Sequence, residues 1–237
     1  MEKEAIERLF LLTDEKELLQ GTKIVIMIRA LKSSYYMVNR NYQELCNLIS
    51  KYEESDISEI FKDKGFANFF KELSRLVHNY LSSTFSLIRH ASRIQKKLTK
   101  LNHSTLQEEY NREVSALQSN DCYWFINDLR VITQHVELPI LNAFFSREID
   151  WQKAKQSIIL DRKSLLLEVK DARSKRYVNT NQKIDLKVAL KQYQALVKGF
   201  YKWFFPRVGK LYSKELKEYN TNEREINKCL TELFHKQ

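Results

Sequence analysis

Residues that interrupt regular structure are scarce in this chain. Its 237 residues include only four glycines and two prolines. A β-sandwich or β-barrel needs turn residues at every reversal of the chain, so this scarcity argues against an all-β fold. Long helices with few reversals are the economical alternative. With 43% apolar residues, the chain can also bury a sizeable core.

Cysteines and long apolar runs are scarce too. The cysteines (Cys46, Cys122 and Cys229) are odd in number and far apart, which predicts neither a disulfide framework nor a zinc site and favours a reducing compartment. The charged N-terminus, MEKEAIERLF, opens no signal peptide. The most apolar early run, residues 24–28, is far too short to span a bilayer. We therefore expect a cytoplasmic protein that does not enter membranes.

Positively charged residues outnumber negatively charged ones. Lys and Arg number 40 against 30 Asp and Glu, a net charge of +10 with a pI near 9.3. Such an excess attracts polyanions, among them nucleic acids, acidic proteins and anionic lipid surfaces, but it does not select a fold.

Apolar residues recur at steps of three and four along most of the chain, which predicts helices. Two long ones are expected, from about 15 to 52 (opened by an Asp14 cap) and from 66 to 101. Shorter helices are expected at 1–12, 104–117, 121–138, 165–178, 185–205 and 222–235, with Pro206 and Gly209 kinking or interrupting the chain after 205. Residues 142–161 are compatible with one short β-hairpin.

These elements predict an all-α protein, an antiparallel bundle of long helices with an additional helical C-terminal part. The pattern shows no internal repeat and no clear boundary between two domains. We expect one domain over residues 1–237, with a helical core at about 15–140 and a C-terminal extension at about 141–237.

Two helices carry clustered positive charge. Arg89, Arg93, Lys97 and Lys100 follow each other at steps of four, four and three, so they share one helix face. Arg173 and Arg176 belong to a second basic helix. Cations near a helix C-terminus complement the helix dipole, but five of them within residues 89–100 exceed that need. Two alternatives stay open, a solvated face and a nucleic-acid-binding face.

Familiar catalytic patterns are absent from the sequence. It contains no Gly-rich phosphate loop, nucleophile elbow, HExxH or EF-hand pattern. The five histidines are scattered, with no Cys or second His at the spacing of metal ligands. We therefore predict no metal and no cofactor.

Arg130 and His135 are the remaining candidates for chemistry. Five residues on a helix correspond to about 500° of rotation, so their Cα–Cβ directions diverge by roughly 140°, yet a long Arg can fold back into a shared pocket. A guanidinium offers fork-shaped donors to phosphate oxygens. An imidazole titrates near neutrality and can take or give a proton. The pair therefore has the chemistry to cleave a phosphodiester.

The context of this pair resembles a known family. The run FINDLR, then four residues, then HVELP, lies on a mid-chain helix and is similar to the signature helix of the HEPN superfamily, in which an Arg-x4–6-His motif lies in a compact helical bundle. The preceding helix with HNYLSSTFSLIRHASR resembles the partner helix packed beside it. The resemblance covers roughly residues 15–140, and only the motif helix is specific.

The resemblance implies metal-independent RNA cleavage at a homodimer interface, as in toxins and defence effectors. The RNA 2′-hydroxyl attacks its own phosphate and leaves a cyclic phosphate end. His135 carries over as acid and base, and Arg130 as the phosphate clamp. Superfamily members also bind nucleotides, or partner nucleotidyltransferases, and toxins have neutralising proteins.

One residue departs from the family pattern. The residue after the Arg is commonly polar, often Asn, in active members, and here it is Val131, which cannot hydrogen-bond to His135 or to substrate. An endoribonuclease and a non-catalytic basic module that binds nucleic acid or an acidic protein therefore both remain open, besides a purely structural helical protein. The aromatic clusters at 123–125 and 200–205 fit core or subunit packing, or base stacking.

Overall fold

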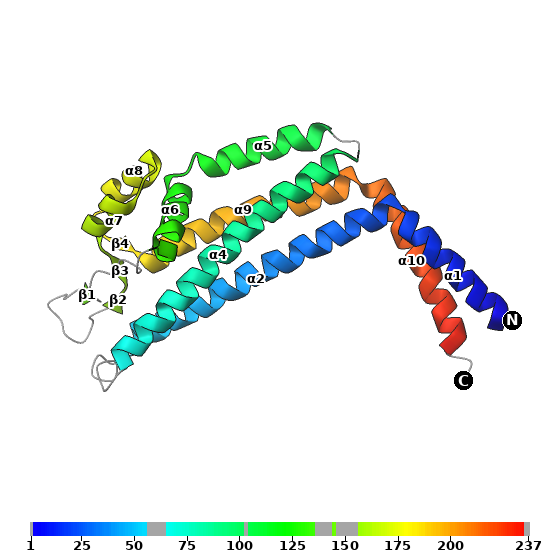
Figure 1. The fold of residues 1–237 in the computed structure, drawn as a ribbon, viewed down its shortest axis with the longest axis horizontal. Coiled ribbons are helices and arrows are strands. Elements are labelled where there is room, and N and C mark those ends of the chain that lie inside the picture. The colour runs from blue at the N-terminus through cyan, green and yellow to red at the C-terminus, as the bar shows by residue number, and fades with distance from the viewer. Residues whose placement is uncertain (1, 56–64, 102–103, 136–143, 146–155, 235–237) are drawn as a thin grey trace.

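The fold is that of a computed structural model, which describes residues 2–55, 65–101, 104–135, 144–145 and 156–234. Helices make up most of these residues: α1 (Glu2–Leu18), α2 (Gln20–Glu54), α4 (Gly65–Thr99), α5 (Ser104–Gln118), α6 (Asp121–His135), α7 (Arg162–Glu168), α8 (Ala172–Thr180), α9 (Leu186–Leu211) and α10 (Ser213–Phe234). The predicted all-α class is confirmed (Figure 1). The expected connection at 53–65 lies largely outside the described residues.

Helices α2 and α4 form a long antiparallel hairpin (Figure 1). The predicted apolar stripe of α2 is its buried face, with the following side chains fully buried: Ile24, Leu31, Val38, Leu45 and Ile49. In α4 the corresponding buried side chains include Leu73, Val77, Tyr80, Leu81 and Leu87. Because apolar residues recur at steps of three and four in both helices, one face of each closes against the other.

Helix α9 is the third long element and lies beside this hairpin (Figure 1). The stripe expected from its sequence is buried: Leu190, Tyr193, Val197, Phe200 and Phe204. The side chain of Asp185 caps the helix by accepting a hydrogen bond from the backbone N–H of Val188 (3.0 Å). Helices α5 and α6 pack against both α4 and α9. The core is therefore shared between the N-terminal hairpin and the C-terminal helix.

Pro206 does not interrupt α9, so of the two predicted outcomes, a kink or an interruption, the interruption is wrong. The helix continues through it to Leu211. Proline removes one backbone hydrogen bond, but the residues on both sides of it are held by packing: Phe204, Val208 and Tyr212 are buried, and the Tyr212 hydroxyl donates to the Leu98 carbonyl (2.6 Å). Tertiary contacts thus outweigh the local penalty.

Helices α1 and α10 pack side by side at the end of the bundle where both termini lie (Figure 1). The break between the first two helices lies at Leu19, so the prediction that Asp14 caps the second helix is wrong. Ion pairs hold α1 along α10, Arg8 to Glu225 (2.8 Å) and Lys16 to Glu223, which explains why α1 continues past Asp14.

The closing helix also begins earlier than predicted, at Ser213 instead of near residue 222. Its side-chain burial differs from the prediction as well. Tyr219 and Cys229 are its buried residues, whereas Phe234, expected inside, is largely exposed.

Four two-residue strands lie near α7 and α8: β1 (Phe144–Phe145), β2 (Gln156–Ser157), β3 (Ile159–Leu160) and β4 (Ile184–Asp185). β1 pairs antiparallel with β2, which matches the expected hairpin, and β3 pairs with β4, which the sequence did not suggest. The single helix predicted at 165–178 is two helices. Val169 is extended and buried between them, and Asp171 caps the second by accepting from the N–H of Arg173 (2.8 Å).

Candidate nucleic-acid interface

The outer face of the C-terminal half of α4, together with the residue that follows the helix, is basic. It consists of five exposed cations, called here the basic stripe: Arg89, Arg93, Lys96, Lys97 and Lys100. The opposite face, which includes Leu87, Ala91 and Leu98, is buried, so helix geometry turns the cations outward. Residues 73–107 contain no acidic side chain. Within the described residues, no ion pair involves any member of the stripe.

A shallow hollow of about 490 Å³ lies beside the Arg89 end of the stripe. It is bounded by α4, α6 and the junction between α7 and α8, and its lining includes Phe85, Trp124, Asn127, Arg130, Val131 and Lys170. The expected packing of the motif helix α6 against α4 is therefore present. The hollow combines aromatic, cationic and amide groups on one surface.

Arg130 is held in this hollow by contacts to two helices. Its guanidinium carbon lies 3.9 Å from the centroid of the Phe85 ring, and its Nη1 donates to the Gln134 side chain (3.0 Å). Its Nε is buried without a hydrogen-bond partner. Arg89 lies over the same ring, at 5.2 Å. The structure thus brings Arg130 and the first cation of the stripe together on one aromatic side chain.

His135 is the last residue of α6, and its side chain lies outside the described part of the chain. Its distance from the Arg130 guanidinium is therefore untested, and its catalytic role stays a prediction. Val131 is half-buried and lines the hollow. Val131 and Arg130 therefore lie in the lining of the same hollow.

Arg173, in α8, contacts residues of α5 and α6. Its guanidinium carbon lies 4.0 Å from the ring of Trp124, and its Nη1 donates to the Gln118 carbonyl (3.0 Å). The indole N–H of Trp124 donates to the same carbonyl (2.7 Å). Arg173 also pairs with Asp171 (3.5 Å). It therefore fastens α8 to the start of α6, while its remaining surface is half-exposed at the edge of the hollow.

Arg176 forms a two-pronged ion pair with Asp121, through hydrogen bonds of 2.5 and 2.6 Å. The guanidinium holds the pKa of Asp121 below its ordinary value. Asp121 is the first residue of α6, and the residue before it supplies the cap. Asn120 Oδ1 accepts from the N–H of Cys122 (2.9 Å), so the prediction of an Asp121 cap is wrong. The charge of Arg176 is compensated within the protein, unlike that of the stripe.

Asp128 is a residue that the sequence did not single out. Its Oδ2 accepts hydrogen bonds from the backbone N–H groups of Lys170 (2.9 Å) and Asp171 (3.0 Å). This fixes the α7–α8 junction at the wall of the hollow. Phe85 was also missed, although its position four residues before Arg89 on one helix face was a visible signal. For Asp128 no such signal exists, since its partners lie in a distant segment.

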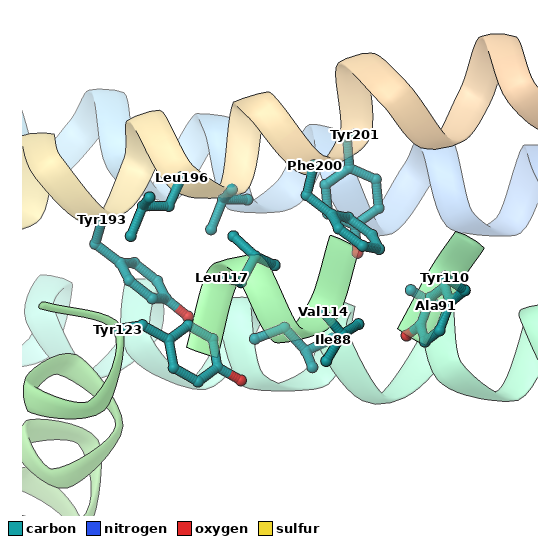
Figure 2. Close-up of a pocket in the computed structure, with 11 residues that line it drawn as sticks. Ile88, Ala91, Tyr110, Val114, Leu117, Tyr123, Tyr193, Leu196, Phe200 and Tyr201 are labelled. Carbon is teal, nitrogen blue, oxygen red and sulfur yellow. The ribbon is translucent and has the colours of Figure 1, made fainter. Parts of the chain in front are cut away.

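A second, enclosed cavity lies between α4, α5, α6 and α9 (Figure 2). Its volume is about 30 Å³, and its lining is almost entirely apolar or aromatic. Burial raises the pKa of one lining residue, Tyr110, to about 12. A cavity of this volume has room for about one water molecule, and it stays dry because its lining is apolar. This cavity is therefore a packing defect and not a ligand site.

The aromatic clusters serve mainly as core. Tyr123 and Phe125 are buried, and Phe125 stacks on Tyr177 with ring centroids 4.6 Å apart. In α9 the side chains of Phe200 and Tyr201 are buried, and those of Trp203 and Phe205 are half-buried against the core. Packing thus accounts for both clusters, except for Trp124 at the hollow.

Two further findings concern classes of site. Among the described residues, no group of three His, Cys, Asp or Glu side chains could hold a metal ion. No helix there is long and apolar enough to cross a membrane.

Comparisons with protein-family models, curated proteins and solved structures gave no match to this chain. The HEPN resemblance therefore stays a prediction.

Proposed function

We propose that this protein binds RNA through the basic stripe and the adjoining hollow. The observation that carries the proposal is the stripe itself, five exposed cations on one helix face with no ion-pair partner in the described chain. Uncompensated charge of this kind is available to phosphates, whose counterions it displaces.

The shape of the surface favours a nucleic-acid strand over an acidic protein. From Arg89 to Lys100 the stripe is about 16 Å long at 1.5 Å per residue. That length matches several successive phosphates of one strand. At its end, Arg89 and Arg130 share the Phe85 ring, and Trp124 lies nearby. Guanidinium planes and aromatic rings are the groups on which unpaired bases stack.

A matched pair of double variants tests the stripe. Arg93→Glu with Lys97→Glu reverses two stripe charges at a spacing of four. Lys198→Glu with Lys202→Glu makes the same change at the same spacing on exposed positions of α9. With about four phosphate contacts, wild-type affinity for single-stranded RNA should fall roughly 50-fold between 50 and 200 mM salt.

The stripe variant should lose most of this affinity and flatten the salt dependence, whereas the α9 variant should resemble wild type. Fluorescence anisotropy with a labelled RNA strand provides the measurement. If the two variants lose the same RNA affinity, the loss follows from net charge alone, and a binding site specific to the stripe is contradicted. Tighter binding of duplex DNA than of any RNA would assign the surface to DNA.

RNA cleavage is the second candidate function. The observation that favours it is the position of Arg130, which lines the hollow with its guanidinium over the Phe85 ring. The proposed reaction follows the family resemblance. The 2′-hydroxyl oxygen bonds to the adjacent phosphorus as the bond from phosphorus to the 5′-oxygen breaks. His135 takes the hydroxyl proton and returns one to the leaving oxygen, which yields a 2′,3′-cyclic phosphate and a 5′-hydroxyl.

Cleavage has its own test. Wild type should cut labelled RNA in EDTA and leave cyclic phosphate ends, identified by their resistance to direct ligation and phosphatase. Arg130→Ala and His135→Ala should each lower the rate by at least 100-fold without altering the circular dichroism spectrum. Cutting that persists in both variants excludes this mechanism, and the absence of cutting in wild type leaves RNA binding as the function.

Several partners follow from the same resemblance. A homodimer that places two copies of the Arg130 surface across one cleft is proposed, and light scattering of the purified chain tests it. A neutralising protein or a nucleotidyltransferase is a proposed partner as well. The proposed compartment is the reducing cytoplasm.

A further inference from the structure

The polar groups of the hollow divide into those that have partners within the protein and those that do not. The acidic groups have partners, since Asp128 accepts two backbone N–H groups and Asp171 pairs with Arg173. The Asn127 amide and the Lys170 ammonium make no hydrogen bond or ion pair within the described chain. An amide and a cation are therefore free to meet a ligand.

The remaining walls suit a flat, partly apolar molecule. Ile88 and Val131 contribute aliphatic surface, and Tyr123 and Trp124 contribute ring surface. The Trp124 ring is fixed in place by the Arg173 guanidinium over it and by its own indole hydrogen bond. A volume of about 490 Å³ falls within the range of small-molecule sites. The hollow has room for a nucleobase with its ribose.

We infer that the hollow receives one unpaired base of the RNA strand whose phosphates lie on the basic stripe, and that Asn127 is the residue that selects this base. The inference rests on the proposed function. Arg89 and Arg130, joined through Phe85, connect the stripe to the hollow, so a strand that follows the stripe delivers its next base there. Lys170, at the opposite wall, meets the following phosphate.

Adenine is the base that this amide selects from among bases that present their Hoogsteen edge to it. An asparagine amide presents one donor and one acceptor side by side, and these pair with N7 and N6 of adenine. Uracil and cytosine lack N7, and guanine carries the acceptor O6 in place of the N6 donor. A base held in a duplex cannot enter the hollow, because it would first have to leave its stack. The strand must therefore be single-stranded where it meets α6.

Three RNA probes of about 12 nucleotides test the inference on the full chain by anisotropy. The first is an all-uridine strand, the second carries one central adenosine, and the third is the second strand annealed to its complement. Wild type should bind the adenosine strand about tenfold more tightly than the all-uridine strand, the gain expected of one bidentate base contact. The duplex should lose this gain.

Asn127→Leu, which keeps the side-chain size, should abolish the tenfold gain, so that the variant binds the adenosine strand and the all-uridine strand equally. Asn127→Asp, which removes the amide donor, should also abolish it and remains informative if the leucine variant fails to fold. Asn220→Leu, at an exposed position of α10, should keep the gain.

Equal wild-type affinity for the two single strands, with the stripe variant still weakened, would overturn the base site and leave RNA binding intact. An adenosine gain that survives both Asn127 variants would also overturn it, because recognition would then lie elsewhere. Absence of binding to every RNA would overturn the proposed function itself.

Discussion

The guanidinium carbon of Arg130 lies 3.9 Å from the centroid of the Phe85 ring. Phe85 belongs to α4, which carries the basic stripe, and Arg130 belongs to α6. Arg89 approaches the same ring from the stripe, at 5.2 Å. One aromatic side chain thus positions two cations from two helices, and it joins the two parts of the proposed RNA surface.

Phe85→Leu is expected to weaken RNA binding about threefold to fivefold. The physical reason is the loss of a cation–π contact, worth about 0.5–1 kcal/mol at partly exposed sites, which leaves Arg130 free to move. Anisotropy with the single-stranded probe measures the change. Phe10→Leu, at an exposed ring on α1, is the control and should have no effect. Unchanged affinity in the Phe85 variant would mean that the ring does not position Arg130 for RNA.

The long helices were predictable because their signal is local. The stripes of α2, α4 and α9 repeat over many turns with few helix breakers, so periodicity alone identifies their buried faces. The breaks at Leu19 and Val169 were not predictable. The first depends on the pairing of α1 with α10, and the second on hydrogen bonds that the backbone N–H groups of the α7–α8 junction donate to Asp128.

The candidate site was predictable to a similar extent. The basic stripe follows from spacing on one helix, opposite an apolar face. The hollow does not, because it forms where α4, α6 and the α7–α8 junction meet. For Arg176 the sequence showed a cation but not its partner, since Asp121 reaches it only in the folded chain. Partners distant in sequence are what periodicity cannot supply.

Gly21→Ala should destabilise the protein although Gly21 lies within a helix. Alanine is ordinarily favoured there by about 1 kcal/mol. In this fold an added Cβ would lie 2.8 Å from the Cβ of Tyr219 and closer still to the carbonyl oxygen of Glu215, so α10 would have to shift. We expect a loss of about 1–3 kcal/mol of unfolding free energy, measured by urea denaturation.

Two other glycines provide the control for that variant. A Cβ added at Gly199 or Gly209, both in α9, meets no atom within 4 Å. Gly199→Ala and Gly209→Ala should therefore raise stability by up to about 1 kcal/mol. A stabilising Gly21→Ala would show that α10 does not pack closely on α2.

A buried polar chain crosses the core, and Gln194 is its central member. The Tyr80 hydroxyl donates to Gln194 Oε1 (2.9 Å), and Gln194 Nε2 donates to Asn39 Oδ1 (2.7 Å). Gln194→Leu removes the hydrogen bonds of the Tyr80 hydroxyl and of Asn39 Oδ1, which should cost about 2–4 kcal/mol of unfolding free energy. Adding Tyr80→Phe should recover part of this loss, because the orphaned hydroxyl is then removed. Strictly additive losses would contradict a coupled network.

Arg176 should matter less to RNA than Arg93, although the sequence marks both as basic surface. Arg176 is neutralised by Asp121, whereas Arg93 has no ion-pair partner in the described chain. Arg93→Gln is therefore expected to lower RNA affinity about threefold to tenfold, in line with the loss of one phosphate contact, and Arg176→Gln by less than twofold. Equal losses in the anisotropy assay would show that RNA breaks the Arg176 ion pair.

The same ion pair predicts how stability depends on pH. Because Arg176 holds the pKa of Asp121 below its ordinary value near 4, the pair stabilises the fold above that value, and its contribution disappears as the pH falls through the lowered pKa. Asp121→Asn should therefore melt about 1–3 °C below wild type at pH 7, and the difference should close below pH 4. Asp14→Asn removes the same charge at an exposed position without an ion pair in the described chain, and it should melt with wild type at pH 7. A difference for Asp121→Asn that stays constant into acid would mean that the asparagine disturbs the start of α6 by packing and not by charge.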